Sequence, residues 1–111
     1  AARGGATPAA ETIADGLACR TPDPGAVALI RDRAERIVRV TDDEILAAVA
    51  AYLQTTHNLV ECAGAAALAA LMKEREAMQG KKVAVIASGG NLDTAMLPDL
   101  LPYLRTGATA A

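Results

Sequence analysis

The sequence has 111 residues, of which 52% are hydrophobic and 22% are charged, and its formal net charge at pH 7 is -2. This length and composition predict one small globular domain and exclude a disordered chain. The net charge indicates no polyanionic partner, and two tyrosines without any Trp or Phe are too few to form a stacking surface for nucleic acid.

The cysteines and the apolar stretches give further limits. Cys19 and Cys62 are far apart, and the chain has one histidine and no CxxC motif. We therefore expect reduced thiols, with neither a disulfide framework nor a metal site. No apolar run is long enough for a membrane span or a signal peptide, so we expect a cytoplasmic protein.

The first predicted helix begins at Asp23 and Pro24. The Asp23 side chain can cap the helix, and proline suits the first turn. Apolar residues then recur at helical spacing from Val27 through Ile30 and Ala34 to Ile37. The charged residues between positions 31 and 36 are most simply a solvated face rather than a binding surface.

A short strand is predicted at residues 37–40, and a second helix follows it. Thr41 and Glu44 have the spacing of a capping box. The acidic residues 42–44 could mimic a metal cluster, but each has a local role at the positive end of the helix dipole. This helix is expected to end near His57, which is either a dipole partner at the helix C-terminus or, as the sharper alternative, a catalytic residue.

Glu61 stands between an apolar pair and a run of small residues. A buried carboxylate needs a partner or a raised pKa, so Glu61 is either a site residue or the acid of a helix N-terminus. Residues 63–72 are apolar all round, which predicts a central helix packed on several sides. Gly80 is expected to end this element.

Residues 83–87 form an uninterrupted apolar run rich in β-branched side chains. Such a run favours a strand buried on both faces of a parallel sheet. Ser88 would stand at the carboxyl end of that strand, and the two following glycines allow a tight turn into a helix capped by Asn91 or Asp93. Ligands collect at this end of the strands in open α/β sheets, so a small-molecule site and a plain turn are the two interpretations.

The ends of the chain are expected to be less ordered. Residues 1–10 are small and include Gly and Pro, which predicts a flexible N-terminal extension. The last predicted helix, residues 92–104, is interrupted or ended near Pro98 and Pro102. Residues 105–111 are expected to form a loose tail.

Three runs, in this order and at these separations, resemble the C-terminal portion of the threonine dehydratase and serine racemase family, which consists of pyridoxal-phosphate enzymes of fold type II. They are ETIADG at residues 11–16, LVECAGA at 59–65 and SGGNLD at 88–93. The resemblance implies an α/β fold, as a partial three-layer (αβα) domain that is rich in helices and has two short parallel-type strands. Residues 11–104 would then form the C-terminal segment of the pyridoxal-phosphate-dependent catalytic domain.

The resemblance also implies a site for pyridoxal 5'-phosphate. Ser88 would set its hydroxyl against the pyridine nitrogen, with Gly16 near the ring and Glu61 near the pyridine edge. Gly89 would bring the backbone close to the ring. A neutral hydroxyl can donate to an unprotonated nitrogen, which suits loss of a β-substituent. The family's Schiff-base lysine and phosphate loop lie upstream of these runs, as do most of its metal ligands. No catalytic residue and no metal ligand is therefore expected in this chain.

The sequence is thus interpreted as the C-terminal part of a threonine or serine dehydratase, an ammonia-lyase that converts a hydroxy amino acid to a 2-oxo acid and ammonia. We expect this chain alone to be inactive. Its expected partners are the N-terminal segment of the same enzyme or another copy of the chain, with a small hydroxy amino acid as substrate, and neither nucleic acid nor membrane. The alternative is a non-catalytic small α/β interaction or anion-binding module.

Overall fold

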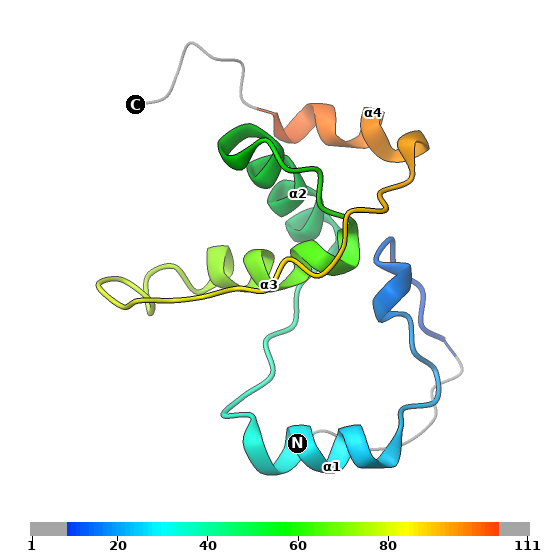
Figure 1. Cartoon of the computed structure of the whole chain (residues 1–111), viewed down its shortest axis with the longest axis vertical. Helices are drawn as coiled ribbons and strands as arrows, with labels where there is room; N and C mark the ends of the chain where they lie inside the picture. The colour runs from blue at the N-terminus through cyan, green and yellow to red at the C-terminus, as the bar shows by residue number, and fades with distance from the viewer. Residues whose placement is uncertain (1–8, 105–111) are drawn as a thin grey trace.

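Helices α2 (Asp42–Thr56) and α3 (Cys62–Lys73) pack against each other and form the core (Figure 1). The computed structural model describes residues 9–104. Small and aliphatic side chains fill the contact, which lets the two helix backbones approach closely. The fully or almost fully buried residues include Ile45, Ala48 and Val49 of α2, and Ala65 and Ala69 of α3.

Three short helical pieces follow one another at the end of the described chain, and the last two pack against α2. They are the 3-10 helix η2 (Thr94–Met96), α4 (Leu97–Leu100) and the 3-10 helix η3 (Leu101–Tyr103). Each proline stands in the first turn of a new piece, so the predicted interruption at Pro98 and Pro102 is confirmed. The Tyr103 hydroxyl donates to Asp43 Oδ1 at 2.9 Å, and this bond to a carboxylate raises the pKa of Tyr103.

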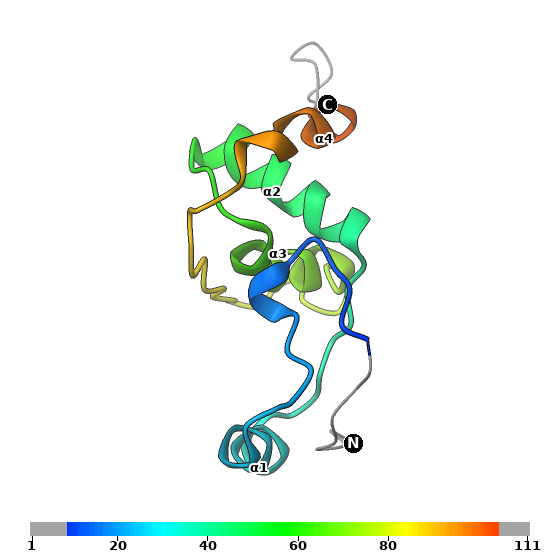
Figure 2. The same cartoon turned by 90° about the vertical axis from the view of Figure 1, so that its right-hand side faces the viewer.

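Helix α1 (Pro24–Arg33) lies apart from the core in both Figure 1 and Figure 2. Its predicted start is confirmed, because Asp23 Oδ1 accepts a hydrogen bond from the Ala26 amide at 2.8 Å. The helix ends earlier than the apolar spacing predicts, so Ala34 and Ile37 lie beyond it. None of its residues is buried. The predicted apolar stripe therefore has no helix to pack against within residues 9–104.

Charged groups attach the connection between α1 and α2 to the end of α3. Arg36 forms an ion pair with Glu74. The Lys73 ammonium group donates to the Arg39 carbonyl oxygen at 2.9 Å and lies 3.1 Å from the Glu44 carboxylate. Most charged residues of the 31–36 cluster are exposed, as expected, but Arg36 also has this structural role.

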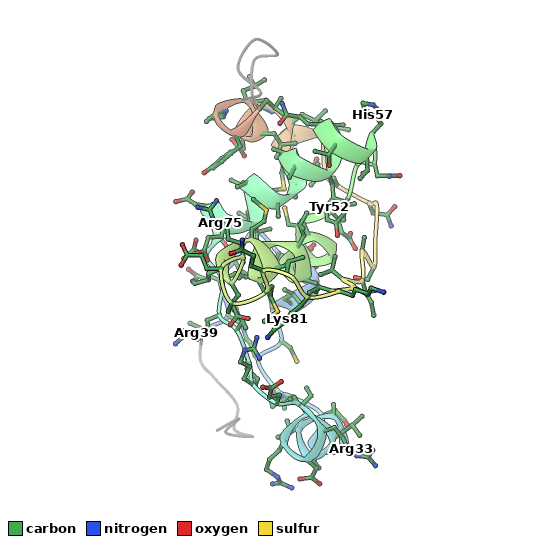
Figure 3. All side chains as sticks on the ribbon, turned by 90° about the vertical axis from the view of Figure 1, so that its left-hand side faces the viewer. Arg33, Arg39, Tyr52, His57, Arg75 and Lys81 are labelled. Atoms are coloured by element: carbon green, nitrogen blue, oxygen red, sulfur yellow. The ribbon has the colours of Figure 1, made fainter. Side chains whose placement is uncertain are left out.

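Helix α2 begins and ends where the sequence predicts. Glu44 donates its backbone N–H to Thr41 Oγ1 at 3.2 Å, and the Thr41 N–H donates to Glu44 Oε2 at 2.8 Å. The predicted capping box is therefore confirmed. After the last turn, His57 adopts a left-handed conformation with φ of 57°, and its side chain points away from the core (Figure 3). His57 thus marks the helix end, as the simpler interpretation expected.

The two predicted strands are not confirmed. Residues 37–40 and 83–87 form no strand, and residues 9–104 contain none. A strand needs a neighbour to complete its backbone hydrogen bonds, and neither segment has one here. Between α3 and the second segment the chain makes irregular turns that end at Gly80, whose φ is +76°.

Within the described part of the chain, no helix has the length and apolar character needed to cross a membrane. Most of the expected N-terminal extension, residues 1–8, lies outside the described residues, as does the expected tail at 105–111.

The ion pairs predict how stability depends on pH. The Thr41 amide and Lys73 lower the pKa of Glu44 below its ordinary value of 4.5, and Arg36 lowers that of Glu74. A lowered folded-state pKa adds stability above the unfolded value, and this is lost as the pH falls through the folded value. We expect Glu44→Gln to destabilise the chain at neutral pH, and the two chains to converge as the pH falls through the lowered pKa of Glu44, measured by urea unfolding. Glu76→Gln is the control, and a Glu44→Gln difference that persists unchanged in acid would contradict this prediction.

Candidate functional site

The first turn of α3 packs directly against the turn at Gly89. The Glu61 N–H donates to the Gly89 carbonyl oxygen at 2.9 Å. A Cβ added to Gly64 would lie 3.0 Å from the Gly89 nitrogen and 3.1 Å from its oxygen. These distances are tighter than ordinary Cβ contacts, so a side chain at Gly64 would require the Gly89 backbone to move away by a few tenths of an ångström.

Glu61 lies over the other glycine of this contact. A Cβ on Gly89 would stand 1.8 Å from Glu61 Oε1, which shows that the carboxylate occupies the space left by the absent side chain. Glu61 is the N-cap residue of α3, but its side chain makes no capping hydrogen bond. Its carboxylate therefore caps no N–H, but its position is the helix N-terminus that one of the two sequence interpretations expected.

The 11–16 run reaches the same turn of α3 through the 3-10 helix η1 (Asp15–Leu17). A Cβ on Gly16 would lie 3.0 Å from the Ala63 Cβ. The structure thus brings Gly16, Glu61 and Gly89 together around one helical turn, although they come from three separate runs. Ser88 adjoins Gly89 in the chain and completes the set of residues that the resemblance selected.

Asp42 holds the 11–16 run in place. Its carboxylate accepts a hydrogen bond from Thr12 Oγ1 at 2.5 Å and one from the Ile13 N–H at 3.3 Å. The Ala14 N–H in turn donates to Thr12 Oγ1 at 3.2 Å, and Ala14 is fully buried. The sequence pattern predicted for Asp42 a role at the dipole of α2. No local signal could have shown its contact with a residue thirty positions earlier.

Ser88 lines an open hollow of about 510 Å3 between α2 and the glycine turn. The hydroxyl forms no hydrogen bond with another described residue. The walls consist of the end of α2, the following loop and the turn itself, and none of the lining residues is Lys or Arg. They are Tyr52, Thr56, Asn58, Leu59, Val60, Ala87, Ser88, Gly89 and Gly90.

Glu61 lines a second, smaller hollow of about 170 Å3 on the other side of the turn. Asp15 and Asn91 contribute to it, together with the Cys62 thiol. Burial raises the pKa of Cys62, and the nearby carboxylates add to this effect. Ser88 and Glu61 therefore face different hollows separated by the Gly89 backbone, an arrangement that spacing alone could not predict.

Tyr52 also lines the hollow beside Ser88, and no sequence pattern pointed to it. Figure 3 shows it between α2 and α3. Its hydroxyl oxygen is buried and has no hydrogen-bond partner among the described residues, although its side chain lines the hollow beside Ser88. A buried hydroxyl without a partner is unusual and costs about 1–3 kcal/mol.

The lysines lie away from this site. Lys73 is the last residue of α3 and pairs with Glu44, so the helix separates it from Glu61 by about 18 Å at the usual rise per residue. Lys81 and Lys82 are exposed and line neither hollow. None of the three therefore lies beside Ser88 or Glu61.

The sequence is similar to a family of known enzymes and to several of its members. Residues 1–89 match the family described as pyridoxal-phosphate dependent enzymes. The L-threonine ammonia-lyase of Geobacter sulfurreducens is 41% identical over 86 residues, which are 78% of this chain and 21% of that protein. The L-threo-3-hydroxyaspartate ammonia-lyase of a Pseudomonas species is 33% identical over 95 residues, which are 86% of this chain and 29% of that protein. The serine racemase of Schizosaccharomyces pombe is 29% identical over 83 residues, which are 75% of this chain and 26% of that protein.

The chain therefore belongs to the family of pyridoxal-phosphate-dependent enzymes. Within it, the chain is similar to threonine dehydratases and serine racemases, and pyridoxal phosphate is the cofactor that the family indicates. The chain spans about 21% to 29% of the length of these relatives.

The close contact at Gly64 predicts a strong response to added volume. We expect Gly64→Val to lower the free energy of unfolding by about 1–3 kcal/mol, because the new side chain would push the Gly89 backbone away from α3. The control is Ala67→Val on the exposed side of the same helix, which should cost less than about 1 kcal/mol through helix propensity alone. Equal effects of the two changes in urea unfolding would show that the contact is not tight.

The buried Tyr52 hydroxyl predicts the opposite response. In this chain, Tyr52→Phe should leave the free energy of unfolding unchanged or raise it by up to about 3 kcal/mol, because it removes an unpaired buried hydroxyl. The matched variant is Tyr103→Phe, which removes a hydroxyl bonded to Asp43 and should lower stability slightly, because an existing hydrogen bond is lost. A clear loss of stability in Tyr52→Phe, measured by urea unfolding, would mean that the hydroxyl has a partner.

Proposed function

We propose that this chain forms the C-terminal part of the catalytic domain of a pyridoxal-phosphate-dependent ammonia-lyase, which converts a hydroxy amino acid to a 2-oxo acid and ammonia. The observation that carries the proposal is the convergence of Gly16, Glu61, Ser88 and Gly89 at the first turn of α3. These residues come from runs separated by more than forty positions in the first gap and more than twenty in the second. Two of the relatives are named as ammonia-lyases of hydroxy amino acids.

The local chemistry fits the ring of the cofactor better than its phosphate. Gly89 and Gly90 line the hollow beside Ser88 without side chains of their own, so a flat ring can lie against their backbone there. Two hydroxyls beside it, those of Ser88 and Tyr52, have no partner among the described residues. No cation lines the hollow, so the phosphate would be held by residues outside this chain.

In the assembled enzyme, bound pyridoxal phosphate supplies an electron sink for the negative charge that develops at the substrate α-carbon. Ser88 would hold the pyridine nitrogen by donating its hydroxyl proton in a hydrogen bond. A neutral donor leaves that nitrogen without a formal charge, which suits loss of the β-hydroxyl group. Gly16 and Glu61 would border the ring, and the Gly89 backbone would set its distance from α3.

Proton removal from the substrate requires a base that this chain does not place at the site. Lys73 is engaged with Glu44 and the Arg39 carbonyl oxygen at the far end of α3. We therefore propose that the chain is inactive alone and acts together with the N-terminal part of the enzyme. An anion-binding module is less well supported, because neither hollow described above is lined by Lys or Arg.

A chimaera tests this function directly. The segment of the Geobacter sulfurreducens L-threonine ammonia-lyase that matches this chain is replaced by residues 9–104, and the purified protein is assayed with threonine and serine. We expect bound cofactor, seen by its absorbance, and formation of 2-oxobutanoate or pyruvate. A folded chimaera that binds the cofactor but acts on neither amino acid would refute the ammonia-lyase proposal.

Ser88 provides the specific test within that chimaera. Loss of one neutral hydrogen bond of about 1 kcal/mol corresponds to about a fivefold decrease in kcat, so Ser88→Ala should show a decrease of this order. Ser88→Thr keeps a hydroxyl and should retain most of the activity. Unchanged turnover in Ser88→Ala would remove Ser88 from the cofactor site.

A further inference from the structure

We propose that Asp42 and Thr12 are a pair of positioning residues for the cofactor: their hydrogen bond fixes the 11–16 run against α3 and thereby holds Gly16 at the edge of the ring. This inference deepens the proposed function and rests on it, because Gly16 borders the ring only in that proposal. Neither Asp42 nor Thr12 lines the hollows beside Ser88 and Glu61, so the pair acts through the backbone that it holds.

The Asp42 carboxylate binds two neighbouring groups of the run. Its Oδ1 accepts a hydrogen bond from the Thr12 hydroxyl, and its Oδ2 accepts one from the Ile13 N–H. The same Thr12 oxygen accepts the Ala14 N–H, so three consecutive residues are tied to one side chain. Hydrogen bonds to an ionised acceptor are stronger than those between neutral groups. The run therefore has a firm attachment immediately before η1.

The chain that follows this attachment is held only locally. Within residues 13–33, the remaining hydrogen bonds join residues at most four positions apart. Helix α1 has no buried residue, and Figure 2 shows it extended away from the core. Displacement of this excursion would therefore reach Gly16 if the run were not fixed. The contact with Ala63 holds Gly16 from one side, and Asp42 holds the run from the other.

Asp42 lies near the first turns of both long helices. It is the first residue of α2. Burial raises the pKa of the Cys62 thiol, at the start of α3, and the charge of Asp42 is the next largest cause. A carboxylate is favoured near helix N-termini, because the free N–H groups there carry partial positive charge. The support of the run is thus a charged group of a core helix rather than part of a loop.

The Cys62 thiol reports whether the run is held. It is 3% exposed and lines a hollow together with Ile13, so a thiol reagent should reach it only when the run opens. The test uses the 111-residue chain with Cys19→Ser, which removes the exposed thiol. Thr12→Val changes no charge and should raise the reaction rate about tenfold, whereas Thr12→Ser keeps the hydroxyl and should stay within about twofold. Equal rates in these two variants would overturn the proposal.

The chimaera described above tests the effect on the cofactor. Thr12→Val should raise the dissociation constant for pyridoxal phosphate about tenfold, because the site is less preorganised. At saturating cofactor it should also weaken the circular dichroism of the cofactor's visible band, since the ring is held less rigidly. Thr12→Ser should restore both. Unchanged affinity and an unchanged band in Thr12→Val would mean that the pair only stabilises the fold, and would overturn its positioning role.

The outcomes separate this inference from the function on which it rests. Weaker cofactor binding in Thr12→Val, in a chimaera that acts on neither amino acid, keeps the positioning pair and refutes the ammonia-lyase proposal. An active chimaera whose affinity does not respond to Thr12→Val refutes the pair and keeps the function.

A second variant covers the case in which the Thr12→Val chimaera does not fold. Asp42→Asn keeps one acceptor oxygen and should still raise the dissociation constant about threefold. Asp43→Asn makes the same change of charge in the same turn of α2 and should leave the constant unaltered. Equal constants in these two variants would refute the role of Asp42.

Discussion

The contact between two glycines determines the arrangement of the candidate site. Gly64 and Gly89 lack a Cβ at the point where the first turn of α3 meets the turn after residue 88, and the Glu61 amide closes the contact with a hydrogen bond to the Gly89 oxygen. Any side chain at Gly64 would separate the two backbones. Because Glu61 and Ala63 belong to the same helical turn, this single contact also sets the positions of the Glu61 carboxylate and of Gly16.

The two ends of α3 are held by different forces. At its N-terminus the packing is steric and depends on small residues, whereas at its C-terminus Lys73 and the following Glu74 form ion pairs with Glu44 and Arg36. Exposed ion pairs contribute little each and respond to salt and pH. The end of the helix at the candidate site therefore depends mainly on packing, and the ion pairs of Lys73 and Glu74 lie at the opposite end.

The accuracy of the sequence predictions follows the range of the interactions. The capping box at Thr41 and the start of α1 at Asp23 need only neighbours three residues away, and both are confirmed. The hydrogen bond from Thr12 to Asp42 joins residues thirty positions apart, and no local pattern predicted it. The apolar spacing beyond Arg33 predicted more helix than forms, since the side chains at Ala34 and Ile37 have no core to pack against.

The sequence by itself determined the helix starts, the breaks at the prolines and the family, because each depends on local stereochemistry or on short runs of residues. The tertiary structure decided which residues meet. It brought Gly16, Glu61 and Gly89 to one turn of α3, placed Ser88 and Glu61 on opposite sides of a backbone, and left residues 83–87 without a neighbour. The physical reason is that close packing and strand pairing depend on atoms distant in the chain, and local propensity carries no information about them.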